Sequence, residues 1–246
     1  MTETLSLRAK IEQSPMGAYQ WMIVVMAAIM NLLDGFDVLA LAFTATAIRS
    51  EFGLTGIELG YLLSAGLFGM TAGSLFLAPL ADKIGRRPLL LMAVSLSAIG
   101  MLGSAFISQY QWLGFWRVIT GLGVGGILVG TNVITSEYSS RKWRSFAISV
   151  YAAGFGIGAV LGGMFAVMLQ GEYGWRSVFL AGAILTGLLL VVLFIWLPES
   201  IDFLTSKQPK NAEVRLNLIA KKIGLASDWK LQARKTKTKL KLIREL

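Results

Sequence analysis

The sequence has no cysteine and no histidine, and only 15% of its 246 residues are charged. These absences exclude disulfides, thiolate and imidazole metal ligands, and catalysis by cysteine or by a serine–histidine pair. Soluble domains carry about 25% charged residues, whereas 55% of this chain is hydrophobic. The composition therefore indicates an integral membrane protein, and we expect neither an enzyme, nor a metal site, nor a cofactor.

Six apolar stretches follow a polar N-terminal tail of residues 1–20. Each is near the ~20 residues needed to cross ~30 Å of hydrocarbon. The spanning helices that we predict are Trp21–Ile48, Leu59–Leu80, Pro88–Ile107, Trp112–Thr135, Phe146–Leu169 and Val178–Leu197. The first stretch is too long for the apolar core of a cleaved signal, and five more follow it, so we expect it to be retained. Together they form a bundle over residues 21–198.

The basic residues are concentrated on one side of this predicted bundle. Twenty of the 23 Lys and Arg residues lie on the side of the two chain ends, and only Arg49 and Arg176 lie on the other. Cytoplasmic loops of membrane proteins carry an excess of Lys and Arg. We therefore predict an all-α membrane protein with six transmembrane helices and both termini in the cytoplasm.

Residues 199–246 form a polar, basic segment that we expect in the cytosol. Its apolar residues at helical spacing predict one amphipathic helix; they are Val214, Leu216, Leu218, Ile219 and Ile223. A basic run follows at Arg234, Lys235, Lys237, Lys239 and Lys241. Such a run is usually a solvated linker that lies against anionic lipid headgroups. No aromatic stacking pattern accompanies it, so we do not expect nucleic acid as a partner.

The first apolar stretch contains two acidic residues, in the sequence Asp34-Gly35-Phe36-Asp37. A carboxylate at the middle of a bilayer costs roughly 2.5–3.5 kcal/mol on insertion scales. Residues three apart share a helix face, and Asn31 extends that polar face. The face must therefore contact other helices or a water-filled cavity. It is either a structural pair bonded to neighbouring helices or a site for a proton or substrate.

A single basic residue, Arg117, lies inside a predicted spanning helix. At 1.5 Å per residue, Asp34 and Asp37 lie roughly 20 and 24 Å above the inner membrane face, and Arg117 lies at roughly 22 Å in a ~30 Å core. The first and fourth helices are also equivalent in a 3+3 repeat, and transporters place their sites at such repeat interfaces. We expect the three residues to meet, in a binding site or in a purely structural ion pair.

Glycines recur at four-residue spacing in the second, fourth and fifth predicted helices. The positions are Gly69 and Gly73, Gly121 and Gly125, Gly126 and Gly130, and Gly154, Gly158 and Gly162. Small residues at this spacing let helix backbones approach closely. The pattern predicts tight helix packing, and it also suits helices that slide.

Several motifs resemble those of the major facilitator superfamily. The loop after the second helix is similar to that family's G-x-L-A-D-[RK]-x-G-R-[RK] motif, with Ala78 at the first glycine; the matching residues are Leu80, Ala81, Asp82, Lys83, Gly85, Arg86 and Arg87. The stretch from Arg117 to Gly126 resembles the family's fourth-helix motif, which begins with an Arg implicated in proton coupling. The glycines of the fifth helix lack the Gly-Pro step of drug antiporters. Leu197-Pro198-Glu199-Ser200 resembles the usual end of the sixth helix.

The Asp34-Gly35-Phe36-Asp37 sequence is similar to the first-helix motif of the aromatic acid:proton symporters. This resemblance implies that the chain is the N-terminal half of a twelve-helix transporter, a 3+3 inverted repeat in a bacterial cytoplasmic (inner) membrane. The implied activity is proton-coupled import of an organic, aromatic carboxylate, driven by the proton gradient. The implied partners are a small organic anion, a proton, the lipid bilayer, and a C-terminal six-helix half or a second copy of the chain.

Residue roles follow from the resemblance. Arg117 would attract the substrate anion, and Asp34 or Asp37 would take up a proton, which would release Arg117 from its acid partner. Asn31 and Phe36 would belong to the same site, and Phe36, Phe43, Trp116 and Phe155 are candidates for stacking on an aromatic ring, although packing is the more usual role. Gating at the cytoplasmic face would involve Asp82, Gly85, Arg86, Arg87 and Glu137.

Two other hypotheses remain open on the sequence alone. The chain is alternatively a truncated, non-transporting membrane protein, or an assembly or sensory half. Within transport, the substrate is alternatively a sugar or a dicarboxylate.

Overall fold

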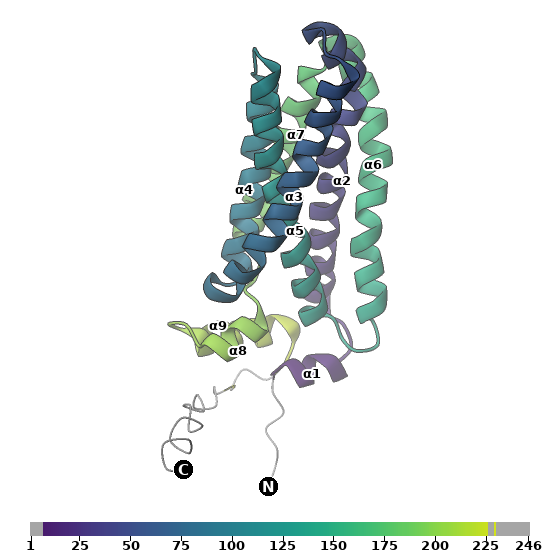
Figure 1. The fold of residues 1–246 in the computed structure, drawn as a ribbon. Coiled ribbons are helices and arrows are strands. Elements are labelled where there is room, and N and C mark those ends of the chain that lie inside the picture. The colour runs from purple at the N-terminus through teal and green to yellow at the C-terminus, as the bar shows by residue number, and fades with distance from the viewer. Residues whose placement is uncertain (1–6, 226–228, 230–246) are drawn as a thin grey trace, which may run out of the picture.

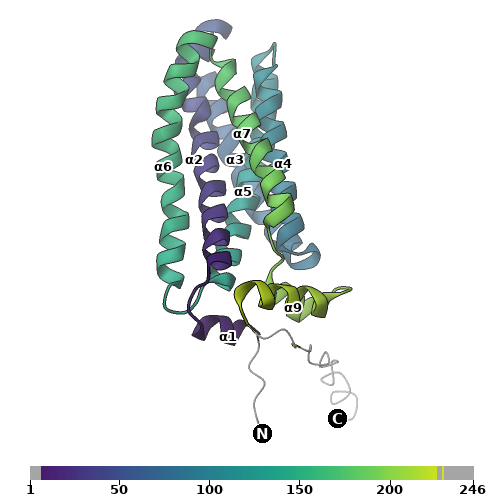
Figure 2. The ribbon, with the colours of Figure 1, turned by 180° about the vertical axis from the view of Figure 1, so that it is seen from behind.

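The computed structural model describes residues 7–225 and Trp229, and within these residues the chain forms nine helices. They are α1 (Leu7–Gln13), α2 (Ala18–Phe52), α3 (Gly56–Ile84), α4 (Arg86–Ala105), α5 (Tyr110–Tyr138), α6 (Arg144–Tyr173), α7 (Arg176–Trp196), α8 (Ile201–Lys207) and α9 (Ala212–Ile223). Helices α2 to α7 stand side by side in one bundle (Figure 1). Helices α1, α8 and α9 lie together at one end, which we call the lower end (Figures 1 and 2).

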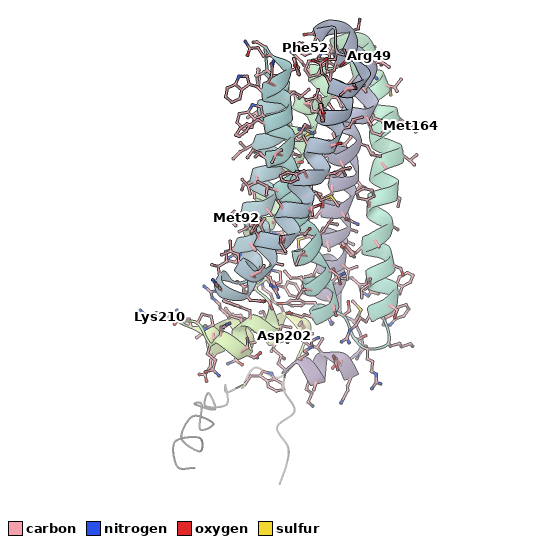
Figure 3. All side chains as sticks on the ribbon, viewed as in Figure 1. Arg49, Phe52, Met92, Met164, Asp202 and Lys210 are labelled. Atoms are coloured by element: carbon pink, nitrogen blue, oxygen red, sulfur yellow. The ribbon has the colours of Figure 1, made fainter. Side chains whose placement is uncertain are left out.

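The six predicted spanning helices are confirmed. Helices α2 to α7 are long and apolar enough to cross a membrane, and each contains or closely matches one predicted stretch. Helix α2 extends past the predicted end into a polar last turn and stops at Gly53, whose φ of 62° suits glycine. Arg49 and Phe52 accordingly lie at the upper end of the bundle, opposite Asp202 and Lys210 (Figure 3).

Short amphipathic helices cover the lower end. Helix α9 coincides with the helix predicted for the C-terminal segment, with Leu216 and Ile219 buried and Leu218 exposed. Helices α1 and α8 were not predicted, because seven residues are too few for a clear periodic pattern. Leu7 and Ile11 nevertheless bury one face of α1. The predicted basic run at 234–241 lies outside the described residues.

Glycine allows two helix pairs to pack backbone against backbone. A side chain at Gly69 or Gly73 of α3 would collide with the backbone of Val118 or Leu122 of α5. In the same way, a side chain at Gly154 or Gly158 of α6 would collide with the backbone of Ala28 or Leu32 of α2. The predicted tight packing at these glycines is therefore present in both pairs.

These two contacts are copies of each other. An offset of 90 residues relates Ala28, Leu32 and Gly35 of α2 to Val118, Leu122 and Gly125 of α5, and an offset of 85 relates the matching positions of α3 and α6. Gln20 near the start of α2 donates to the carbonyl of Tyr138 at the end of α5, so the two equivalent helices run in opposite directions. The bundle is thus a 3+3 inverted repeat, as predicted.

Candidate binding site in the bundle

Asp37 is the buried acid best placed for chemistry. Its side chain is 1% exposed on α2, and the hydroxyl of Ser97 on α4 donates a 2.6 Å hydrogen bond to Oδ2. The other carboxylate oxygen, Oδ1, is buried and has no hydrogen-bond partner among the described residues. Asp37 therefore retains one unused acceptor inside the bundle. A buried carboxylate oxygen without a donor is energetically costly.

Arg117 on α5 is the buried cation, with only 3% of its surface exposed. Its Nη2 donates to Ser104 Oγ at 2.9 Å and to Thr120 Oγ1 at 3.0 Å. The guanidinium lies 4.8 Å from the centre of the Phe179 ring, a cation–π distance. Its Nε is buried, and no group in the described part of the chain accepts a hydrogen bond from it. Neutral groups therefore hold the guanidinium in place through Nη2.

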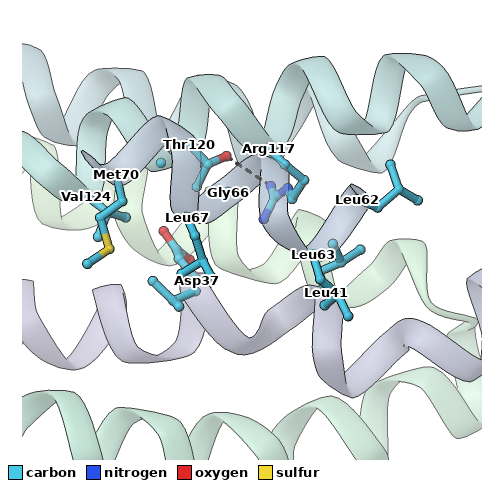
Figure 4. A pocket seen from close by; sticks show the side chains of 12 residues that line it. Asp37, Leu41, Leu62, Leu63, Gly66, Leu67, Met70, Arg117, Thr120 and Val124 are labelled. Atoms are coloured by element: carbon cyan, nitrogen blue, oxygen red, sulfur yellow. Dashed lines mark hydrogen bonds between the residues drawn. The ribbon is translucent and has the colours of Figure 1, made fainter. Parts of the chain in front are cut away.

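Asp37 and Arg117 line one cavity of about 40 Å³ between α2, α3 and α5 (Figure 4). Among the described residues, no ion pair within 4.0 Å joins Arg117 to Asp37 or Asp34. The sequence placed acid and base at one depth, and the structure brings this pair to one cavity. It does not form the ion pair that the sequence suggested. The cavity is large enough for water, which needs about 10–15 Å³, but is smaller than the pockets of about 300–1,000 Å³ that drug-sized ligands occupy.

The other predicted site residues of α2 face elsewhere. Asn31 Nδ2 donates to the carbonyl of Tyr151 on α6 at 2.9 Å, and Phe36 packs against Gly162 and Gly182. Asp34 is buried with Oδ2 unpartnered, outside the cavity lining. From Asn31 to Asp34, and again from Asp34 to Asp37, a step of three residues ends about 60° short of a full helical turn. Two steps therefore spread the predicted polar face over about a third of the helix circumference.

The three other aromatic candidates pack between helices. Phe43 faces Gly163 of α6, Trp116 faces Gly103 of α4, and the backbone of Phe155 abuts Gly35. None of the three lines the cavity of Asp37 and Arg117. Arg117 instead contacts the ring of Phe179 on α7, which was not among the predicted site residues.

At the lower end, Glu199 caps helix α4. Its Oε1 accepts from the backbone N–H of Arg86 at 2.7 Å and of Arg87 at 3.0 Å, so a negative charge meets the positive end of the helix. Gly85, with a φ of 104°, lies directly against this carboxylate and has no room for a side chain. In the sequence, Glu199 stands out only as part of a helix-end motif, because its partners in the cap lie more than 110 residues away.

The remaining predicted gating residues form two contacts near this cap. Arg86 donates to the exposed Asp82 at 2.7 Å across one turn. Glu137 at the end of α5 accepts from the Ser200 hydroxyl and from the backbone N–H of Ile201, both at 2.8 Å. Glu137 thus joins α8 to the bundle, one residue away from the Glu199 cap.

Inverted three-helix repeats with a candidate binding site between the repeats are typical of secondary transporters. Residues 27–243 match the Major Facilitator Superfamily, and the chain belongs to this family. It is therefore a protein of a transporter family and not an enzyme.

The chain is similar to the gallate transporter of Pseudomonas putida, at 36% identity over 204 residues that cover 83% of this chain and 45% of the relative. It is 34% identical over 216 residues to the 4-hydroxybenzoate transporter PcaK of the same organism, covering 88% and 48%. The fold is similar to that of the proton:xylose symporter XylE, with a TM-score of 0.74 at 23% identity, covering 82% of this chain and 50% of that one. The chain spans about half the length of the curated relatives it matches.

Proposed function

We propose that this chain is the N-terminal half of a proton-coupled importer of an aromatic carboxylate, in a bacterial cytoplasmic membrane with both termini in the cytoplasm. The similarity to gallate and 4-hydroxybenzoate transporters supports the substrate class. The excess of Lys and Arg at the lower end supports the orientation. A second six-helix half, or a second copy of the chain, completes the transport path.

One observation carries the proposal. Asp37 and Arg117 line the same cavity without an ion pair, and each has one buried atom, Oδ1 and Nε, that lacks a partner. An unpaired buried charge costs several kcal/mol, on the order of 3–5 when a partner is removed. Ionisable residues that are buried inside a membrane protein at such a cost are typically part of a functional site.

The chemistry follows from the two groups. A guanidinium binds a carboxylate through two parallel hydrogen bonds and keeps its charge, so Arg117 holds the substrate anion. Removal from water favours the neutral form of a carboxyl group, so Asp37 accepts the co-transported proton. Because Arg117 already rests on neutral groups, the anion binds without first displacing an acid. This replaces the predicted exchange of an internal partner for the substrate.

The residues that line the cavity form one wall of the proposed substrate site. Its 40 Å³ lie between helices of this chain, and the second half supplies the opposite wall. Asp34 is the alternative proton acceptor. Asp82 and Arg86 at the lower end are proposed to hold the cytoplasmic side shut against that half, whereas Arg87 and Glu137 make their contacts within this chain.

The test is uptake of labelled 4-hydroxybenzoate by cells that express this chain joined to the C-terminal half of the Pseudomonas putida relative. Arg117→Gln should lower uptake by about 30-fold or more, because losing one partner of a buried charged pair costs ~2–5 kcal/mol. Asp37→Asn should abolish accumulation against a gradient while leaving exchange of internal for external substrate. Arg49→Gln, an exposed arginine at the upper end, is the matched control and should transport normally. Wild-type uptake in both site variants would contradict the proposal.

A further inference from the structure

A second hollow, of about 220 Å³, opens at the lower end between α9 and the last turn of α7. It lies far along the bundle from the cavity of Asp37 and shares no lining residue with it. Its rim combines basic side chains with large apolar ones, including Arg87, Trp196, Arg215, Leu218 and Lys222. Nothing in the proposed transport chemistry uses Arg215 or Lys222.

Three cations converge on this hollow from two elements. Arg87 comes from the first turn of α4, and Arg215 and Lys222 lie two turns apart on α9. Within the described part of the chain, no ion pair involves any of them. Lys222 lies 5.2 Å from the centre of the Tyr19 ring, which keeps its charge at the hollow. The positive charge is therefore available to a ligand.

Arg87 is partly used and partly free. Its Nη2 donates to the carbonyl of Phe194 at 2.6 Å, which fixes the guanidinium beside the end of α7. Its Nε is buried and has no hydrogen-bond partner within residues 7–225. The one carboxylate among the lining residues, Glu199, accepts the backbone N–H groups of Arg86, Arg87 and Ser200 at Oε1, and the three cations outnumber it. A buried, unused donor in a hollow with excess positive charge calls for an anion.

The neighbouring surface determines which kind of anion fits. Phe194, Ile195 and Trp196 on α7 are 66%, 66% and 53% exposed, directly above the basic groups. Trp at this position is typical of the membrane–water interface. A free phosphate or carboxylate would leave this apolar surface unused, whereas acyl chains would cover it. Basic pockets between helices at the cytoplasmic side bind anionic lipid headgroups.

From this arrangement we infer that the hollow between α7 and α9 is a binding site for one anionic phospholipid. The phosphate accepts hydrogen bonds from Arg87, Arg215 and Lys222, and the acyl chains lie along the exposed face of α7. The bound lipid ties α9 to the end of the bundle. The inference does not depend on the solute that the complete transporter carries.

The experiment is native mass spectrometry of the purified 246-residue chain in detergent, titrated with phosphatidylglycerol or phosphatidylcholine of equal chain length. The wild type should retain phosphatidylglycerol more tightly than phosphatidylcholine. The double variant Arg215→Gln/Lys222→Gln should bind phosphatidylglycerol about 30-fold more weakly, since each basic group near the headgroup contributes about fivefold. Lys221→Gln removes the adjacent lysine of α9, which does not line the hollow, and should bind as the wild type does.

Two outcomes would overturn the inference. One is equal retention of phosphatidylglycerol by the double variant and the wild type. The other is competition by glycerol phosphate, which lacks acyl chains, at the same concentration as the lipid; this would assign the hollow to a small soluble anion. Thermal unfolding of the double variant without added lipid should match that of the wild type, so that weaker binding reports the lost charges.

Discussion

Ser97 of α4 donates a 2.6 Å hydrogen bond to Oδ2 of Asp37 on α2, so a hydroxyl of one helix orients the buried acid of another. The bond fixes which carboxylate oxygen faces the protein. The second oxygen, Oδ1, is left without a donor. The acid is thus held on one side and free on the other, an arrangement that several measurements can test.

Ser97→Ala should destabilise the protein by about 1–3 kcal/mol, because it leaves a second buried oxygen of Asp37 without a donor. In the Asp37→Asn background the same change should cost a different amount, with a coupling energy of about 0.5–3 kcal/mol. Thermal unfolding in detergent, followed by tryptophan fluorescence, measures both. Ser95→Ala is the control, since the Ser95 hydroxyl donates to the carbonyl of Leu91 in its own helix. Additive effects of Ser97 and Asp37 would contradict the contact.

Gly158→Ala should destabilise the bundle by about 1–3 kcal/mol, because its methyl group would collide with the backbone of Leu32 and force α6 away from α2. Gly156→Ala lies on the same helix with open space around it and should be neutral or slightly stabilising. Unfolding of the two variants under identical detergent conditions provides the comparison. Equal stability would show that the helices do not pack as closely as described.

Glu199→Ala should lower stability by about 1–2 kcal/mol through loss of the cap on α4. Three backbone N–H groups, those of Arg86, Arg87 and Ser200, would lose their acceptor. Glu172→Ala, an exposed acid at the other end of the bundle, should change stability by less than about 0.5 kcal/mol. Urea or thermal unfolding distinguishes them. A Glu199 variant as stable as the Glu172 variant would argue against the cap.

The contact of Glu12 with Arg144 should make the lower end sensitive to acid. A 2.6 Å hydrogen bond from Arg144 holds the pKa of Glu12 below its ordinary value of 4.5. The contact therefore stabilises the fold at pH values above about 4.5, and this contribution is lost as the pH falls through the lowered pKa. Unfolding temperatures of the wild type and Glu12→Gln should differ at pH 7 and converge near pH 3. A difference that is constant with pH would contradict this assignment.

Hydropathy located the six spanning helices because the bilayer demands about 20 apolar residues whatever the tertiary packing. It missed the last turns of α2, where Arg49 and Glu51 continue the helix into the interface. It also missed α1, whose apolar positions Leu7 and Ile11 are too few to stand out. The lengths of the spanning helices, which the hydrocarbon thickness sets, were therefore predictable. The helix ends that depend on caps, and the short helices that pack against the bundle, were not.

The candidate site was predictable only in its charged members. Asp37 and Arg117 stand out because any charge inside a spanning helix is expensive. Ser97, Ser104 and Phe179 have ordinary side chains for membrane helices, and their importance comes from α4 and α7 packing beside α2 and α5. Nothing local in the sequence distinguishes them from other serines and phenylalanines.

The 90-residue offset between α2 and α5 carries a consequence for how the domain can diversify. By this offset the counterpart of Asp37 is Ile127, and the counterpart of Arg117 is Ala27; both counterparts are buried apolar residues. The helix packing is therefore present in both repeats, whereas the charges of Asp37 and Arg117 each occur in one repeat only. Substitutions at Asp37 and Arg117, which have no charged counterpart in the other repeat, can change substrate recognition. The glycine contacts that occur in both repeats, and that determine the architecture, then remain unchanged.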